Sequence, residues 1–285
     1  MEIAILKTLI YFDLFDFPLK AWEIQKWLIA RKSDLNELDQ GLRTLIAQKK
    51  IAHRHGLIFL KNREVLVSRR LRKLVLSEKL LSTAYFLSRI LLIIPWIQLV
   101  GITGDLSLMN SGKKDRIELL VLTSKNRLWV SRLLALGLLD LFGAKKKCAP
   151  YFISIEALEG SQKDIYVAHQ ILQMKVVWQR NEMYRKYLYA NSWVFDLLPN
   201  WITQVDYGTR RTDGRFKFLK LNDQSCKVNF KRNRLQKLTD PVFLRLEIWA
   251  KQVQKGTDQP FSDLAQLAIV KEYSKRLRRL KMANG

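Results

Sequence analysis

The sequence predicts an α+β protein in which helices are interspersed with a small number of short strands. Three observations support this fold class. Apolar residues recur at helical spacing over most of the chain, the runs at 117–123 and 151–155 are short and β-prone, and Gly56 separates two further β-prone runs. A hydrophobic content of 48% and a charged content of 27% are typical of a folded globular protein. The 285 residues are enough for two or three domains, and we divide them into 1–62, 63–94, 95–200 and 201–285.

Residues 1–62 show the pattern of three helices followed by a β-hairpin. The first helix carries apolar residues at helical spacing from Ile3 to Ile10, and Pro18 suits the first turn of the second. Ser33 and Asp34 are capping residues for the third helix. The segment 51–60 then has a central glycine between two short β-prone runs, which indicates a hairpin. This order of elements resembles a winged helix-turn-helix.

The third helix of such domains commonly enters the major groove of DNA. Here its leading end carries Asp34, Glu37 and Asp39, which repel phosphate, so we expect this unit to act in packing or protein contact. The residues of the hairpin remain candidate phosphate contacts: His53, Arg54, His55 and Lys61. A DNA-binding regulator built on this unit is one alternative function.

The next segments predict a long helix and then a covered sheet. A helical pattern over 63–94 connects the N-terminal unit to the core, and Pro95 marks the change to a buried strand that ends near Ile102. The run 117–123 predicts a second strand that is buried on both faces. A helix over 126–143 ends at a glycine, as helices commonly do.

The rest of the chain is predicted to be mostly helical and basic. A third strand is expected at 151–155, and helical structure is expected throughout 163–198. Residues 209–238 hold ten Lys or Arg against two Asp and predict a loop or insertion. Helices return at 244–253 and 264–282.

One spacing in the middle of the chain resembles a known family. Gly104 and Asp105 follow the first core strand, and ten residues later the second strand opens with Arg116-Ile117-Glu118. The polymerase-β-like nucleotidyltransferase superfamily has Gly-Ser, about ten residues, and then carboxylate-apolar-carboxylate. The segments 127–132, 150–154 and 164–174 add to a likeness with bacterial nucleotidyltransferase-domain proteins, which covers about residues 95–200. The resemblance implies a mixed sheet with helices, preceded by the winged-helix-like unit and followed by a mostly helical basic region.

The resemblance also implies an activity, the transfer of a nucleoside monophosphate from a nucleoside triphosphate to a hydroxyl. Members of the family hold Mg²⁺ with the two motif carboxylates, and hard oxygen ligands suit that ion. In this chain Asp105 stands in place of the serine and Arg116 in place of the first carboxylate, while Glu118 keeps the second. We expect Arg116 to oppose Mg²⁺ and to form an ion pair with Asp105, Glu118 or both.

The family pattern, carried over by position, gives the candidate site residues. Glu118 and Asp115 are the catalytic candidates, although Asp115 points to the opposite face of the strand unless a bulge intervenes. Glu118 and Glu156 are the candidate metal ligands. The candidate nucleotide-binding residues are Gly104, Asp105, Lys125 and Arg127.

Charge and cysteine content bound the partners and the compartment. The 50 Lys and Arg exceed the 26 Asp and Glu by 24, which favours a polyanionic partner such as nucleic acid or an anionic membrane surface. Two cysteines without a CxxC pair fit a reducing cytosol, and no apolar run is long enough to predict a membrane span. The candidate nucleic-acid-binding residues lie in the basic segment: Arg210, Arg211, Arg215, Lys217, Lys231, Arg232 and Arg234.

These observations favour a nucleotidyltransferase-like protein with a degraded metal site. We expect it to bind nucleotide or nucleic acid in the cytoplasm, with nucleotidyl transfer lost or reduced. Three alternatives stay open: an active enzyme that uses Asp115, Glu118 and Glu156 with Mg²⁺, the DNA-binding regulator, and a protein that binds anionic membranes through its C-terminus. Mg²⁺ is expected only if the enzyme is active, and the acceptor and the oligomeric state stay open.

Overall fold

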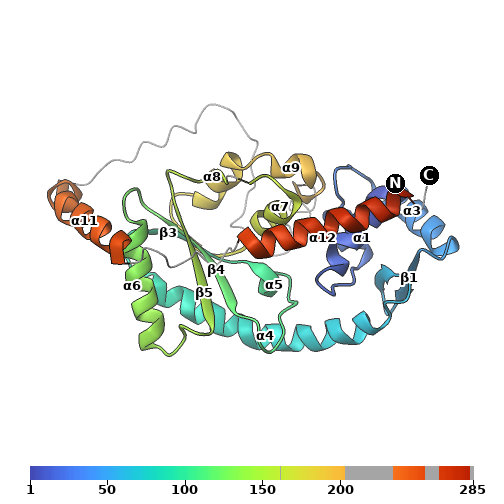
Figure 1. Ribbon diagram of the computed structural model, residues 1–285, viewed down its shortest axis with the longest axis horizontal. Helices are drawn as coiled ribbons and strands as arrows, with labels where there is room; N and C mark the ends of the chain where they lie inside the picture. The colour runs from blue at the N-terminus through green and yellow to red at the C-terminus, as the bar shows by residue number, and fades with distance from the viewer. Residues whose placement is uncertain (161, 203–233, 254–262, 283–285) are drawn as a thin grey trace.

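The computed structural model describes residues 1–160, 162–202, 234–253 and 263–282 (Figure 1). It confirms an α+β fold with a mixed sheet of four strands. None of the helices in these ranges is long and apolar enough to cross a membrane.

The N-terminal unit contains the three helices and the hairpin that the sequence predicts: α1 (Glu2–Asp13), α2 (Ala21–Lys26), α3 (Leu35–Ala47), β1 (Ile51–Arg54) and β2 (Leu57–Leu60). Asp34 caps α3, because its Oδ1 accepts a hydrogen bond of 2.7 Å from the Glu37 amide. The hairpin turns at His55 and Gly56, which both have positive φ angles, as the tight turns of hairpins require. Leu19 forms an isolated antiparallel bridge with Ile58 and so adds a third short strand segment beside the hairpin.

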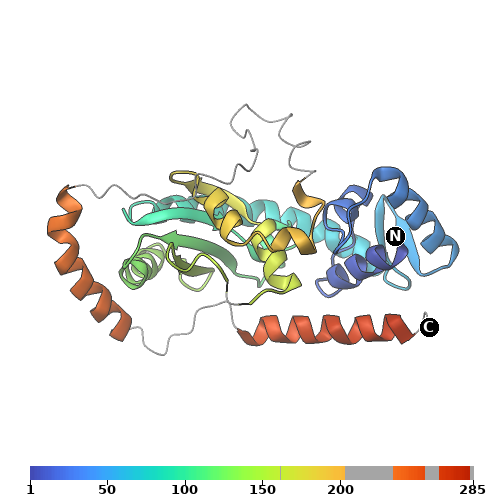
Figure 2. The ribbon, with the colours of Figure 1, turned by 90° about the horizontal axis from the view of Figure 1, so that it is seen from above.

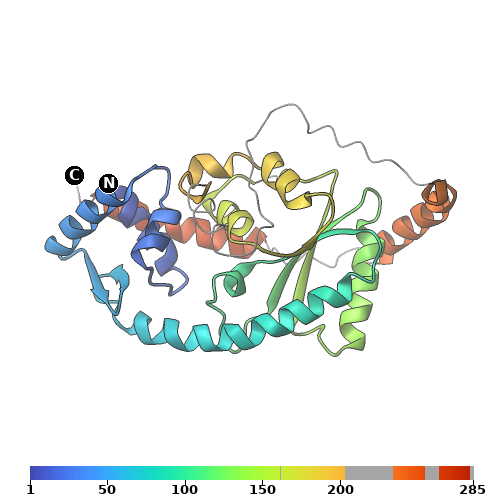
Figure 3. The ribbon, with the colours of Figure 1, turned by 180° about the vertical axis from the view of Figure 1, so that it is seen from behind.

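Helix α4 (Val65–Leu91) connects this unit to the core as the sequence predicts, and Figure 3 shows it running along one side of the molecule. Its first turn buries Leu66 and Val67 near the hairpin, and its last turns bury Leu87 and Leu91 against the sheet. Much of the stretch between them is exposed. The helix therefore packs mainly at its two ends.

The sheet has the strand order β5-β4-β3-β6. Its strands are β3 (Ile97–Ile102), β4 (Ile117–Thr123), β5 (Cys148–Ser154) and β6 (Lys175–Gln179). β3 pairs antiparallel with β4 and with β6, whereas β4 and β5 are parallel and are joined by the crossover helix α6 (Leu128–Leu141). The short helix α5 (Gly104–Ser107) follows β3.

Helices cover both faces of the sheet. The remaining described helices are α7 (Ile165–Leu172), α8 (Met183–Ala190), α9 (Val194–Leu197), α11 (Arg234–Val253) and α12 (Asp263–Met282). One face buries Val100, Ile102 and Val121 in a cluster with residues of α4 and α6. The opposite face buries Leu99 and Leu120 in a cluster that includes α7 and the N-terminal unit. One hydrophobic core therefore runs from residues 1–62 into residues 95–200, and α12 extends along both parts (Figure 2).

The structure corrects three expectations about the elements. Residues 163–198 are not helical throughout, because 175–179 form the edge strand β6. The third predicted strand begins three residues earlier than expected, at Cys148, because its pairing with β4 starts at Ile117. Helix α11 begins at Arg234, inside the segment expected to be a loop, and the other six basic candidates of that segment lie outside the described residues.

Candidate functional site at the glycine turn

Gly104 forms a tight turn between β3 and α5 that only glycine accommodates well. Its φ of +65° is a left-handed conformation, and a β-carbon at this position would lie 2.7 Å from the Glu118 carboxyl carbon. The amide of Thr103 donates a hydrogen bond of 3.0 Å to the Glu118 carbonyl, which holds the turn beside the start of β4. The structure thus brings Gly104, Asp105 and Glu118 together, as the sequence spacing predicts.

Three carboxyl groups at this end of the sheet act on one another electrostatically. Burial, together with the negative charges of Asp105 and Asp115, raises the pKa of Glu118 to about 7, against a smaller opposing effect of Arg116. Burial also raises the pKa of Asp105, and Lys73 partly offsets this. Asp115 is exposed, and its Oδ2 accepts a hydrogen bond of 2.7 Å from the Gly112 amide. Near neutral pH Glu118 is therefore often protonated.

These residues do not fit the Mg²⁺ pair that the family resemblance implies. Within the described parts of the chain, no three His, Cys, Asp or Glu side chains are placed so that they could share a metal ion. Glu118 is opposite Ala149 on β5, and the next residue of β5 on the same face is Tyr151. Strand β5 therefore offers no second carboxylate at the level of Glu118.

Arg116 does not form the expected ion pair with Asp105 or Glu118. Its Nη2 instead donates to the carbonyl oxygens of Cys148, at 2.9 Å, and Lys145, at 3.4 Å. Pairing of β4 with β5 places these carbonyls beside the start of β4, so the guanidinium is held at the edge of the sheet. It influences Glu118 only through its charge.

The backbone amide that a phosphate would approach is already bonded. Gly104 N–H donates to the Gln170 Oε1 at 3.0 Å, and the Thr103 hydroxyl donates to the same oxygen at 2.7 Å. The Tyr166 phenol lies beside Gln170, and burial, Glu118 and Asp105 raise the pKa of this phenol. Gln170 of helix α7 thus occupies the backbone amide that a phosphate would need at the glycine turn. The sequence pattern did not identify Gln170, because only the packing of α7 on the sheet brings it there.

Lys125, Arg127 and Glu156 lie at the opposite end of β4 and do not share a site with Glu118. Because β4 and β5 are parallel, Glu156 comes out beside the end of β4, where its Oε1 forms an ion pair of 2.5 Å with Lys125 Nζ. Arg127 is buried, and its guanidinium carbon lies 5.2 Å from the ring centre of Phe243 in α11. The expected metal pair of Glu118 and Glu156 is therefore wrong.

The two elements of the N-terminal unit that could contact DNA are helix α3 and the hairpin of β1 and β2. On α3, Glu37 pairs with Arg31 and Asp39 with Arg43, so part of the acidic leading end is neutralised within the unit. The hairpin residues His53, Arg54 and His55 are exposed. The hairpin thus presents accessible basic residues on this unit.

Comparison with models of protein families, with curated proteins and with solved structures finds no match for this chain.

Proposed function

We propose that this protein has a nucleotidyltransferase-like core that binds nucleotide or nucleic acid and has lost, or strongly reduced, nucleotidyl transfer. The observation that carries the proposal is the position of Glu118. It is the one carboxylate that the spacing retains, it packs against the glycine turn, and the facing positions of β5 supply no partner acid.

Two features of the core support a nucleotidyltransferase-like ancestry. The glycine turn after β3 lies beside the start of β4, as the family arrangement requires, and β4 continues through a crossover helix into a parallel neighbour. The excess of 24 positive charges supports a polyanionic or nucleotide partner.

Three features support loss of transfer. Arg116 stands where a carboxylate is needed, Gln170 occupies the amide of the turn, and the pKa of about 7 leaves Glu118 often uncharged. Two-metal transfer needs several ionised oxygen ligands around the triphosphate. On the face of β4 this site offers one carboxyl group, Glu118, which is only partly ionised near neutral pH.

A transfer assay tests this proposal. The protein is incubated with labelled nucleoside triphosphates, Mg²⁺ or Mn²⁺, and total RNA, next to Glu118→Gln as a matched control. We expect equal, background labelling from both proteins. Label incorporation by the parent that Glu118→Gln abolishes would show an active enzyme.

The DNA-binding alternative is favoured by one observation, the Leu19–Ile58 bridge, which completes a small winged-helix-like sheet. Its test is duplex binding by the full chain, because residues 1–62 share their core with the rest. A regulator would bind duplex DNA with a steep salt dependence that Arg54→Ala weakens.

A further inference from the structure

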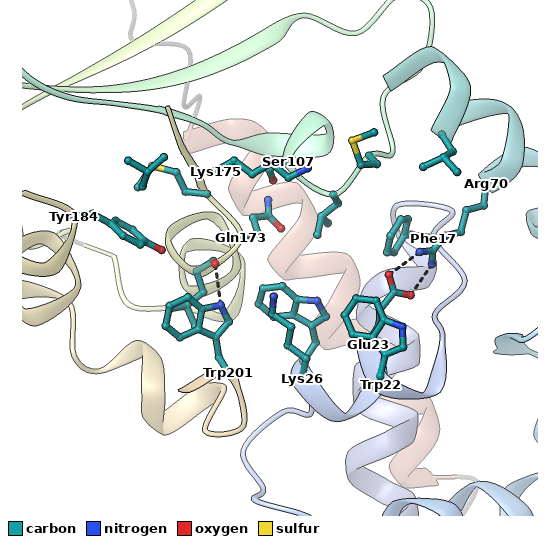
Figure 4. Close-up of a pocket in the computed structure, with 17 residues that line it drawn as sticks. Phe17, Trp22, Glu23, Lys26, Arg70, Ser107, Gln173, Lys175, Tyr184 and Trp201 are labelled. Atoms are coloured by element: carbon teal, nitrogen blue, oxygen red, sulfur yellow. Dashed lines mark hydrogen bonds and ion pairs between the residues drawn. The ribbon is translucent and has the colours of Figure 1, made fainter. Parts of the chain in front are cut away.

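A cavity of about 490 Å³ lies between the N-terminal unit and the core (Figure 4). Its walls come from α2, α4, the end of α5 and the segment that joins α7 to β6. This volume is within the range of small-molecule sites. Glu118, Asp105 and Asp115 do not line this cavity.

The charged groups of this cavity leave an excess of two positive charges. Arg70 and Glu23 neutralise each other through two hydrogen bonds, of 2.6 Å and 2.9 Å. Lys26 from α2 and Lys175 from β6 also line the cavity, and neither forms an ion pair with a carboxylate of the described chain. Burial lowers the pKa of both lysines; for Lys26, the nearby Glu23 opposes this effect, and the charge of Lys175 adds a smaller lowering. An anion placed between the two ammonium groups would relieve this repulsion.

Two aromatic side chains that line the cavity use their polar atoms in hydrogen bonds to backbone carbonyls. Trp201 Nε1 donates to the Leu172 carbonyl at 2.9 Å, and the Tyr184 hydroxyl donates to the Ile171 carbonyl at 3.3 Å. Trp27 is buried, and Lys26 Nζ lies 4.9 Å from its ring centre. Trp22 is 51% exposed although it is a large aromatic residue lining the cavity. A planar ring can therefore stack here beside the two lysines.

We infer that this cavity binds a phosphate monoester that carries a planar ring, of the mononucleotide class, with its phosphate between Lys26 and Lys175 and its ring against the tryptophans. A phosphate monoester is close to a dianion at neutral pH and matches the two excess charges. The inference rests on the proposed nucleotide binding, and it places the nucleotide in this cavity and not at the Gly104 amide. Ser107 and Gln173 line the cavity and hydrogen-bond to the Gly104 carbonyl, so the two places are neighbours.

Calorimetric titration of the full chain with adenosine monophosphate tests this inference. Lys26→Met and Lys175→Met remove one charge each and keep most of the side-chain volume. Lys146→Met is the matched control, because Lys146 is exposed in the turn before β5 and does not line the cavity. We expect each cavity variant to weaken binding at least 10-fold and the control to bind like the parent. Thermal melting of each variant verifies that it is folded.

Two further titrations distinguish the contributions of the phosphate and the ring. Adenosine and inorganic phosphate should each bind the parent at least 10-fold more weakly than adenosine monophosphate, and equal binding of either would overturn the inference. Binding of nucleotide or RNA that neither lysine variant weakens would also overturn it, while the proposed function would stand. If the parent binds no nucleotide and no RNA, both are wrong.

Discussion

Arg276 of α12 forms an ion pair of 2.7 Å with Asp13 of α1, although 263 residues separate them. The other oxygen of Asp13 accepts a 2.7 Å hydrogen bond from Arg63, just before α4. The side chain of Asp13 is only 8% exposed, and Tyr273 of α12 also donates to the Lys7 carbonyl of α1. Asp13 thus joins three parts of the chain at one carboxylate.

Asp13→Asn should destabilise the protein by about 1–3 kcal/mol, because it removes a buried anion that two arginines share. Asp39→Asn is the control, since the ion pair of Asp39 with Arg43 is exposed and should contribute well under 1 kcal/mol. Denaturant unfolding of both variants measures the difference. Equal losses would show that Asp13 does not join these elements.

His169 should make the protein less stable as the pH falls. It is fully buried and stacks on Tyr11 with ring centres 4.2 Å apart, and within the described parts of the chain neither ring nitrogen has a hydrogen-bond partner. Burial lowers the pKa of His169 to about 3, below the usual value of 6.5. Between these two values the unfolded chain takes up a proton that the folded protein does not, so stability falls by at most about 1.4 kcal/mol per pH unit.

His169→Phe should remove this contribution and flatten the pH dependence between about pH 6.5 and 3. The ring contacts with Tyr11 remain possible, and no buried polar nitrogen is left unpaired. Unfolding free energies measured over this pH range provide the test. An unchanged slope in the variant would show that His169 is protonated in the folded protein.

Gly104→Ala should be more destabilising than Gly143→Ala, although both glycines have positive φ angles, +65° and +62°. A β-carbon at Gly143 meets no atom within 4 Å, so this variant has only the backbone strain of about 1–2 kcal/mol. At Gly104 the β-carbon also collides with the Glu118 carboxylate. Thermal unfolding of the two variants measures the difference, and adding Glu118→Ala to Gly104→Ala should recover part of the loss. Equal effects would contradict the close packing of the turn on Glu118.

Glu118→Gln should stabilise the protein increasingly as the pH rises from about 4.5 to 7. The pKa of Glu118 is raised to about 7, so over this range the folded state keeps a proton that the unfolded state has released. Stability therefore falls with rising pH, by at most about 1.4 kcal/mol per unit, and glutamine removes this effect. Unfolding of parent and variant at pH 5 and pH 7.5 is the measurement. A gain that does not grow with pH would show that Glu118 ionises normally.

The elements that the sequence predicts well have local causes. The run 117–123 is aliphatic and bounded by charge and a threonine, and β4 has these bounds. Asp34 caps α3 as expected because capping depends only on neighbouring residues. Strand β6 was predicted as helix because Val176, Val177 and Trp178 lie between helical segments, and only pairing with β3 makes them a strand.

The candidate site was predictable where it depends on two neighbouring strands and not beyond. The antiparallel pairing of β3 and β4 brings Gly104 next to Glu118. The direction of Arg116 depends on carbonyls at the start of β5, and Glu156 is separated from Glu118 by the parallel pairing of β4 and β5. The cavity of Lys26 and Lys175 depends on packing between segments about 150 residues apart, which no local pattern contains.

Release of pyrophosphate from a bound nucleoside triphosphate tests the central claim most directly. The full chain is loaded with adenosine triphosphate and Mg²⁺ or Mn²⁺, total RNA is added as acceptor, and pyrophosphate is measured against Glu118→Gln. We predict that the nucleotide binds and is recovered intact, with the same background release from both proteins. Pyrophosphate release by the parent that disappears in Glu118→Gln would contradict the loss of transfer that Arg116, Gln170 and the raised pKa of Glu118 imply.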